Sequence, residues 1–133
     1  MPTRKVIIPE GMENIYDTYH YAPGILVGDT LYCSGQVGRD ADLNVVQGVE
    51  AQCTQAFENV GKVLAAAGAD WDDVVELESW FAPDMGNLKT FMAVKDRFFT
   101  NLYPTWTGFG VPSFSMPGII VEIKCKAILG LTS

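Results

Sequence analysis

Residues 49–81 read VEAQCTQAFENVGKVLAAAGADWDDVVELESWF and decide the fold, because a predicted helix and a predicted strand follow each other there. Apolar residues recur at spacings of three or four over residues 49–67, which predicts an amphipathic helix. Gly68 stands where a helix commonly ends in a left-handed residue. From residue 73 to residue 81 the pattern alternates, which predicts a strand that Pro83 ends. The apolar face of the helix is Val49, Cys53, Phe57, Val60 and Leu64.

A second helix is predicted from residue 85 to about residue 102, with Asp84 as its N-terminal cap and Pro104 as its stop. It would bury one apolar face, which also takes the aliphatic part of Lys95. That face is Leu88, Phe91, Met92, Phe98 and Leu102.

Further strands are predicted on both sides of these helices. They cover residues 4–8, two runs within 24–34 around a Gly28-Asp29 turn, residues 106–111, and a long final run over 119–129. Residues 12–24 read as irregular and residues 38–48 as a loop. The order of elements predicts a single α+β domain over residues 1–133, with two helices on one face of a mixed sheet.

The other face of that sheet is expected to be neither fully apolar nor fully polar. In the alternating pattern Val75, Leu77 and Phe81 point to the helices. The opposite set is Val74, Trp80, Ile120 and Ile128 together with Glu76, Glu78, Lys124 and Lys126. Such a mixture suits a subunit interface in which carboxylates meet lysines, so the pattern alone predicts a homo-oligomer.

Composition excludes several classes of function. A net charge of −7 disfavours binding to a phosphate backbone, so no nucleic-acid partner is expected. No apolar run reaches the ~18 residues that a membrane span needs, and the N-terminus has no signal-peptide pattern. Three cysteines without a CxxC pair favour a reduced, cytoplasmic protein. The only histidine, His20, lies far from them in sequence, so neither a metal site nor a cofactor is expected.

Several short motifs occur together in one order along the chain. They are GDTLYCSGQ at residues 28–36, VLAAAGA at 63–69, DVV at 73–75, FF at 98–99, YP at 103–104 and VEI at 121–123. With these motifs the chain resembles the RidA/YjgF family of reactive-intermediate deaminases, also called L-PSP endoribonucleases, almost from end to end.

The resemblance implies a chorismate-mutase-like fold, a homotrimer around a central barrel, and ligand clefts between subunits. It also implies hydrolysis of imines or enamines derived from amino acids. In the family an arginine after the second helix binds the substrate carboxylate, which suits the fork of a guanidinium.

Residue by residue, the resemblance places Tyr21, Ser34 and Gly35 in the substrate pocket and makes Glu122 the carboxylate that handles the hydrolytic water. The family's arginine, however, falls on Trp106. Its cysteine falls on Gly108, and its second-helix asparagine falls on Met92. An indole offers one donor and no charge, so a substrate other than the standard small 2-imino acid is expected.

Alternatives stay open for individual residues. Glu122 is either an acid/base in the cleft or one half of an interface ion pair. Trp106 is either a stacking platform for the ligand or an apolar plug, and His20 is either a donor in the cleft or a loop residue. Arg39, in the loop after SGQ, is a candidate replacement cation. The three cysteines are expected to pack in the core.

For the whole chain, hydrolytic deamination competes with ligand binding without catalysis in a stress-related or regulatory trimer. The acidic charge and the lone histidine disfavour RNA cleavage.

Overall fold

The computed structural model describes residues 2–131, in which one seven-stranded sheet is combined with three α-helices. The helices are α1 (Glu13–Asp17), α2 (Val49–Ala67) and α3 (Lys89–Phe98), with short 3-10 turns at Trp71–Asp73 and Pro83–Met85. The strands are β1 (Arg4–Ile7), β2 (Gly24–Val27), β3 (Thr30–Cys33), β4 (Gln36–Val37), β5 (Val74–Phe81), β6 (Thr105–Gly110) and β7 (Val121–Ile128).

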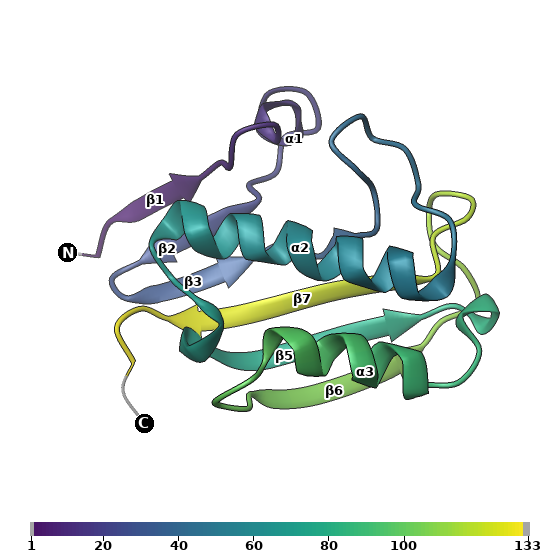
Figure 1. The fold of residues 1–133 in the computed structure, drawn as a ribbon. Helices are drawn as coiled ribbons and strands as arrows, with labels where there is room; N and C mark the ends of the chain where they lie inside the picture. The colour runs from purple at the N-terminus through teal and green to yellow at the C-terminus, as the bar shows by residue number, and fades with distance from the viewer. Residues whose placement is uncertain (1, 132–133) are drawn as a thin grey trace.

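The sheet is mixed, as predicted. Its order is β1-β2-β3-β7-β5-β6, and β5 and β6 run parallel whereas the other pairs are antiparallel. The short strand β4 follows β3 after a break at Ser34-Gly35, and both strands pair with β7. Helices α2 and α3 lie next to each other on one face of the sheet (Figure 1). The predicted α+β class with two helices on one face is therefore confirmed.

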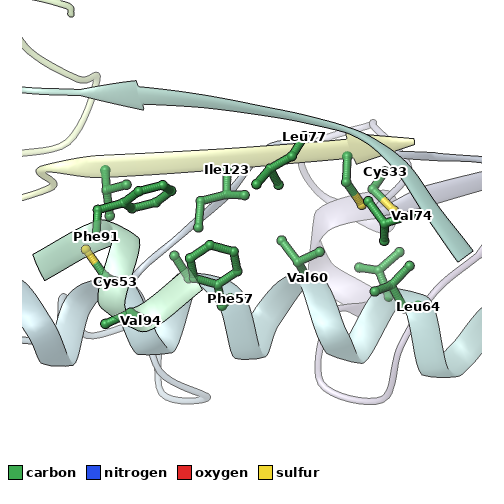
Figure 2. Packing of buried hydrophobic residues seen from close by; sticks show 14 of the residues in the cluster. Cys33, Cys53, Phe57, Val60, Leu64, Val74, Leu77, Phe91, Val94 and Ile123 are labelled. Atoms are coloured by element: carbon green, nitrogen blue, oxygen red, sulfur yellow. The ribbon is translucent and has the colours of Figure 1, made fainter. Parts of the chain in front are cut away.

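The core lies between these helices and the sheet, and Phe57 of α2 is at its centre (Figure 2). The Phe57 ring is fully buried. It stacks on Phe98 at 5.1 Å between centroids and meets Phe91 at 5.4 Å. Burial of apolar area is the main favourable term in folding, and aromatic side chains contribute the largest areas. One ring thus holds the two long helices together.

Helix α2 has the predicted bounds and the predicted end. Gly68 adopts a left-handed conformation with φ of +82°, and its amide donates to the carbonyls of Leu64 and Ala65. A residue with a side chain would be strained there.

Helix α3 is shorter than predicted, and Asp84 does not cap it. Asp84 lies in the 3-10 turn, which ends at Gly86 with φ of +78°, and the helix starts only at Lys89, whose amide donates to Asn87 Oδ1 at 2.9 Å. Consequently the buried positions differ. Val94 is fully buried, whereas Leu88 and Met92, both predicted in the core, are exposed.

Two residues assigned to the open sheet face are buried instead. A register shift between Val74 and Glu76 turns the Val74 side chain into the core, so alternation counted from Leu77 fails there. Ile120 precedes the first residue of β7 and is buried in the core cluster. Two short elements were also not predicted, namely α1 within the supposedly irregular residues 12–24, and β4.

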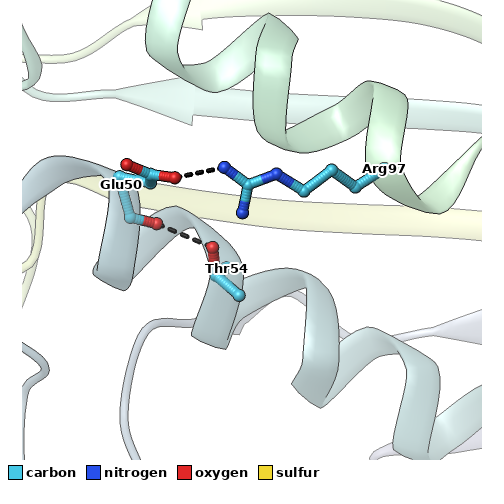
Figure 3. Close-up of polar contacts among 3 residues, drawn as sticks. All are labelled: Glu50, Thr54 and Arg97. Atoms are coloured by element: carbon cyan, nitrogen blue, oxygen red, sulfur yellow. Dashed lines mark hydrogen bonds and ion pairs between the residues drawn. The ribbon is translucent and has the colours of Figure 1, made fainter.

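One ion pair joins the surfaces of the two long helices (Figure 3). The guanidinium of Arg97 on α3 contacts the carboxylate of Glu50 on α2, and the Thr54 hydroxyl donates to the Glu50 carbonyl at 2.8 Å. Both charged side chains are more than half exposed. An exposed pair adds little to stability, so the apolar contacts around Phe57 dominate this packing.

Replacing Phe57 by alanine is expected to lower the free energy of unfolding by about 3–5 kcal/mol, because it empties the centre of the core. The matched control is Tyr103→Ala, which removes a ring that is 77% exposed and should change stability by less than about 0.5 kcal/mol. Urea unfolding at one fixed protein concentration measures both. A loss for Phe57→Ala no larger than that for Tyr103→Ala would contradict the assigned core.

Candidate functional site

A cavity of about 180 Å³ lies where α1, the 38–48 loop, the middle of α2 and strand β7 approach one another. In Figure 1, α1 and the loop between β4 and α2 lie on the same side of α2, and both contribute residues that line the cavity. Its volume is below the ~300 Å³ typical of drug-sized ligands, so it suits a small metabolite. Among its lining residues are Tyr21, Gly35, Arg39, Asn59, Lys62 and Glu122.

Glu122 on β7 is half-buried and lies directly against Gly35. A Cβ atom built on Gly35 would come 2.8 Å from the Glu122 carboxyl carbon, so a side chain at position 35 would displace the carboxylate from its present place. Burial raises the pKa of Glu122 because it disfavours the charged form, and the charge of Lys124 opposes this effect. The break between β3 and β4 therefore places a carboxylate with a raised pKa in the cavity wall.

Tyr21 and Ser34 were both predicted to lie in the substrate pocket, but only Tyr21 is among the residues that line the cavity. Tyr21 lines the cavity and is half-exposed. The Ser34 hydroxyl donates to the carbonyl of Ala22 at 2.5 Å, and the Ser34 amide donates to the carbonyl of Pro23. Ser34 thus holds the segment that carries Tyr21. His20 is exposed, has a φ of +61°, and is not among the lining residues.

Arg39 also lines the cavity, and a buried amide fixes its backbone. Asn59 of α2 donates through Nδ2 to the carbonyls of Val37 and Arg39, at 2.9 and 2.8 Å, and its Oδ1 accepts from Gln55. Nearer the start of α2, the Gln52 side chain donates to the carbonyl of Val46 at one end of the loop and accepts from the amide of Ile120. The loop that carries Arg39 is therefore tied to α2 at two points.

Trp106 and Gly108 lie elsewhere in the chain, in an open, largely apolar groove along the edge strand β6. The indole packs 5.7 Å from Phe91 and donates through Nε1 to the Ser79 hydroxyl at 2.8 Å, while the Lys95 ammonium lies 5.2 Å from the ring centroid. Since indole has one donor, that donor is not free for a ligand. Within one chain, the candidate residues thus form two separate groups.

The cysteines are buried free thiols, which confirms the core-packing prediction. Burial raises the pKa of Cys53 to about 11, and a hydrogen bond with Cys33 together with burial raises that of Cys125 well above its usual value. Such thiols are poor nucleophiles because the thiolate is disfavoured. In residues 2–131 no three His, Cys, Asp or Glu side chains cluster in a way that could hold a metal ion. None of the described helices is long and apolar enough to cross a membrane.

Several residues of the cavity were not predicted from the sequence. Lys62 and Asn59 on α2 and Met12 on the segment leading into α1 all line it. One signal was available: Gln52 and Asn59 each lie one residue from the apolar face of the helix, and amides that become buried need hydrogen-bond partners. Lys62 carried no such signal, because a lysine on a helix surface is ordinary.

Known proteins resemble this chain in both sequence and fold. The family described as "Endoribonuclease L-PSP" matches residues 12–129. The RutC family protein YjgH of Escherichia coli (strain K12) is 34% identical over 128 residues, which is 96% of each chain. The human 2-iminobutanoate/2-iminopropanoate deaminase is 32% identical over 112 residues, covering 83% of this chain and 80% of its own. The solved structure of protein YJGH superposes with a TM-score of 0.85 at 32% identity, over 97% of this chain and 98% of that one.

Glu122→Gln is expected to stabilise the protein at pH 7, because ionised Glu122 is less favourable folded than unfolded. A raised folded pKa means that this penalty is fully present above that pKa. It should fade as the pH falls through the folded pKa and vanish below the unfolded value of about 4.3, where the side chain is protonated in both states. Denaturant unfolding of both proteins between pH 7 and pH 4 measures the difference. If the free energy of unfolding of Glu122→Gln rises relative to that of the unaltered protein as the pH falls, the pKa of Glu122 is lowered instead.

Proposed function

The chain belongs to the Endoribonuclease L-PSP family, and from that membership we propose that it hydrolyses a small imine or enamine to a carbonyl compound and ammonia. The observation that carries this proposal is the half-buried carboxylate of Glu122 in the wall of a metabolite-sized cavity. The relatives named imine deaminases support the class of reaction.

In the proposed reaction a water molecule adds to the imine carbon. Glu122 takes a proton from that water as the C–O bond forms and gives it to the nitrogen, which yields a carbinolamine. It then takes the hydroxyl proton of the carbinolamine and passes it to the amino group, which leaves as ammonia as the C–N bond breaks and the carbonyl forms. An enamine first takes a proton on carbon to become the imine. A carboxylate with a raised pKa suits this exchange, because a group that transfers protons works best when its pKa is near the working pH.

The proposed substrate differs from the standard small 2-imino acids of the family, because Trp106 stands where the resemblance places the carboxylate-binding arginine. The indole N–H is already bonded to Ser79, so β6 offers apolar surface and no charge. Loss of a charge-assisted contact would weaken the binding of a small carboxylate by about tenfold or more. Aromatic or otherwise larger imines would lose less.

We further propose a homotrimer in which the β6 groove of one copy meets the Glu122 cavity of the next. The two groups of candidate residues lie apart within one chain, and contact between copies would unite them. The helix-free sheet face carries aromatic and charged residues that suit burial, including Trp80 stacked on Phe109 and Lys126 near the Tyr32 ring. Buried free thiols fit a reducing compartment, so the cytoplasm is the proposed location.

A trimer that binds a small molecule without turning it over is the second candidate. Trp106 favours it, since the β6 wall has no cation. RNA cleavage, which the name of the family suggests, is disfavoured by the net charge of −7.

Glu122→Gln is expected to lower the rate of imine hydrolysis by at least about a hundredfold, because the amide cannot carry a proton. Imines are generated in place by an amino-acid oxidase, and their loss is followed by trapping with semicarbazide, from alanine-derived to aromatic imines. The matched control is Glu58→Gln, an exposed position of α2 outside the cavity, which should keep full activity. Turnover by Glu122→Gln at the unaltered rate would refute the assignment of Glu122. Absence of turnover by the unaltered protein across the panel would favour the second candidate.

Light scattering is expected to give three times the chain mass of 14.5 kDa. Trp80→Asp should lower the measured mass, because it places an unpaired charge where the helix-free faces would meet. The exposed Tyr103→Asp serves as the control and should leave the mass unchanged. A 14.5 kDa species for the unaltered protein would refute the trimer.

A further inference from the structure

Two basic residues, Arg39 and Lys62, are among those that line the cavity, and neither forms an ion pair with a described residue. In the part of the chain that the structure describes, the ion pairs are Lys95–Asp96 and Glu50–Arg97, so Arg39 and Lys62 take part in none. Both line the cavity that contains Glu122. A cation that is not neutralised by the protein is available to an anionic ligand.

We propose that Arg39, assisted by Lys62, binds the carboxylate of the substrate and so replaces the charge that β6 lacks. A guanidinium can hold a carboxylate through two parallel hydrogen bonds, and the lysine adds a second positive charge. The substrate class is then a carboxylate whose charged end lies against the 38–48 loop, whereas the resemblance places the carboxylate of the family's standard 2-imino acids where Trp106 stands here. This inference rests on the proposed function only in taking the Glu122 cavity as the ligand site.

The backbone around Arg39 is held in place before a ligand arrives. The Asn59 side chain is 6% exposed, and its two N–H groups are bonded to the carbonyls of Val37 and Arg39 itself. The guanidinium takes no part in this contact, so it can bind a ligand without disturbing the loop. A fixed anchor loses less conformational freedom on binding than a mobile one does.

Among the described residues, none of the three carboxylates that line the cavity forms an ion pair with Arg39 or Lys62. Asp40 lines the cavity beside Arg39, but its Oδ1 accepts from the amides of Asp42 and Asn44 and so closes the loop's own turn. Glu122 lies against Gly35 at the β3–β4 break. Glu10, the remaining carboxylate of the wall, is exposed, and so is Lys62, so water screens both of these charges. Half-buried Arg39 is therefore the main cation available to a ligand at this site.

The position of the charge separates this site from one built on β6. Arg39 reaches the cavity from the loop between β4 and α2, whereas Trp106 faces α3 on the other side of β5. A carboxylate bound by Arg39 therefore approaches Glu122 from the wall formed by the loop and α2.

Benzoate and benzamide test the proposal, because they share a shape and differ in charge. Calorimetry on the full-length protein should show that benzoate binds more tightly than benzamide. Arg39→Gln should weaken benzoate at least tenfold and leave benzamide unchanged. Arg39→Lys should recover part of the lost benzoate affinity, and Lys62→Gln should lower the benzoate affinity several-fold. Arg4→Gln, on the exposed strand β1 outside the cavity, is the matched control and should bind both compounds normally.

Unchanged benzoate affinity in Arg39→Gln would overturn the proposal, as would equal weakening of both compounds or no benzoate binding by the unaltered protein. Thermal unfolding of each variant shows whether the fold is kept. The proposed reaction fails separately. If benzoate binding depends on Arg39 but no imine is hydrolysed, Arg39 is the carboxylate-binding residue and the proposed reaction is wrong. If imines are hydrolysed and Arg39→Gln binds benzoate normally, the proposed reaction is supported and the role of Arg39 is wrong.

Discussion

The geometry of the cavity depends on two buried amides of one helix. Gln52 and Asn59 both face inwards from α2, and their side chains hydrogen-bond to the backbone of the 38–48 loop and of the segment before β7. Buried amides are costly unless every donor and acceptor is paired, and these are paired. They therefore fix the loop against the same helix that forms the core, and a stable core and a defined cavity come from one element.

The amphipathic pattern of residues 49–67 was sufficient to predict α2 to the residue, because its apolar spacing and its terminal glycine agree. Predictions failed where a local feature overrides a periodic pattern. The register shift at Val74 reversed the side chains, and the left-handed Gly86 delayed the start of α3. Alternation and helical spacing assume regular geometry, so they contain no information about either irregularity.

The site was predictable only in part, for a related reason. Motif positions led to Tyr21, Gly35 and Glu122, which the fold gathers at one cavity. The same motifs led to Trp106 and Gly108, which lie along β6 and apart from that cavity within one chain. Lys62 joins the cavity only because the β3–β4 break and the loop bring α2 to it, and such a juxtaposition depends on tertiary structure. The presence of Trp106 on β6 therefore does not by itself decide how the ligand's charge is bound, because Arg39 and Lys62 line the other group of candidate residues.

The proposals above place the ligand in the Glu122 cavity, with its carboxylate on the 38–48 loop and its reacting carbon at Glu122. A crystal structure of the protein with benzoylformate, an aromatic 2-oxo acid of the product class, tests it most directly. We expect the carboxylate to lie on Arg39 and the carbonyl carbon to face Glu122. Benzoylformate seated in the Trp106 groove, away from both residues, would contradict it.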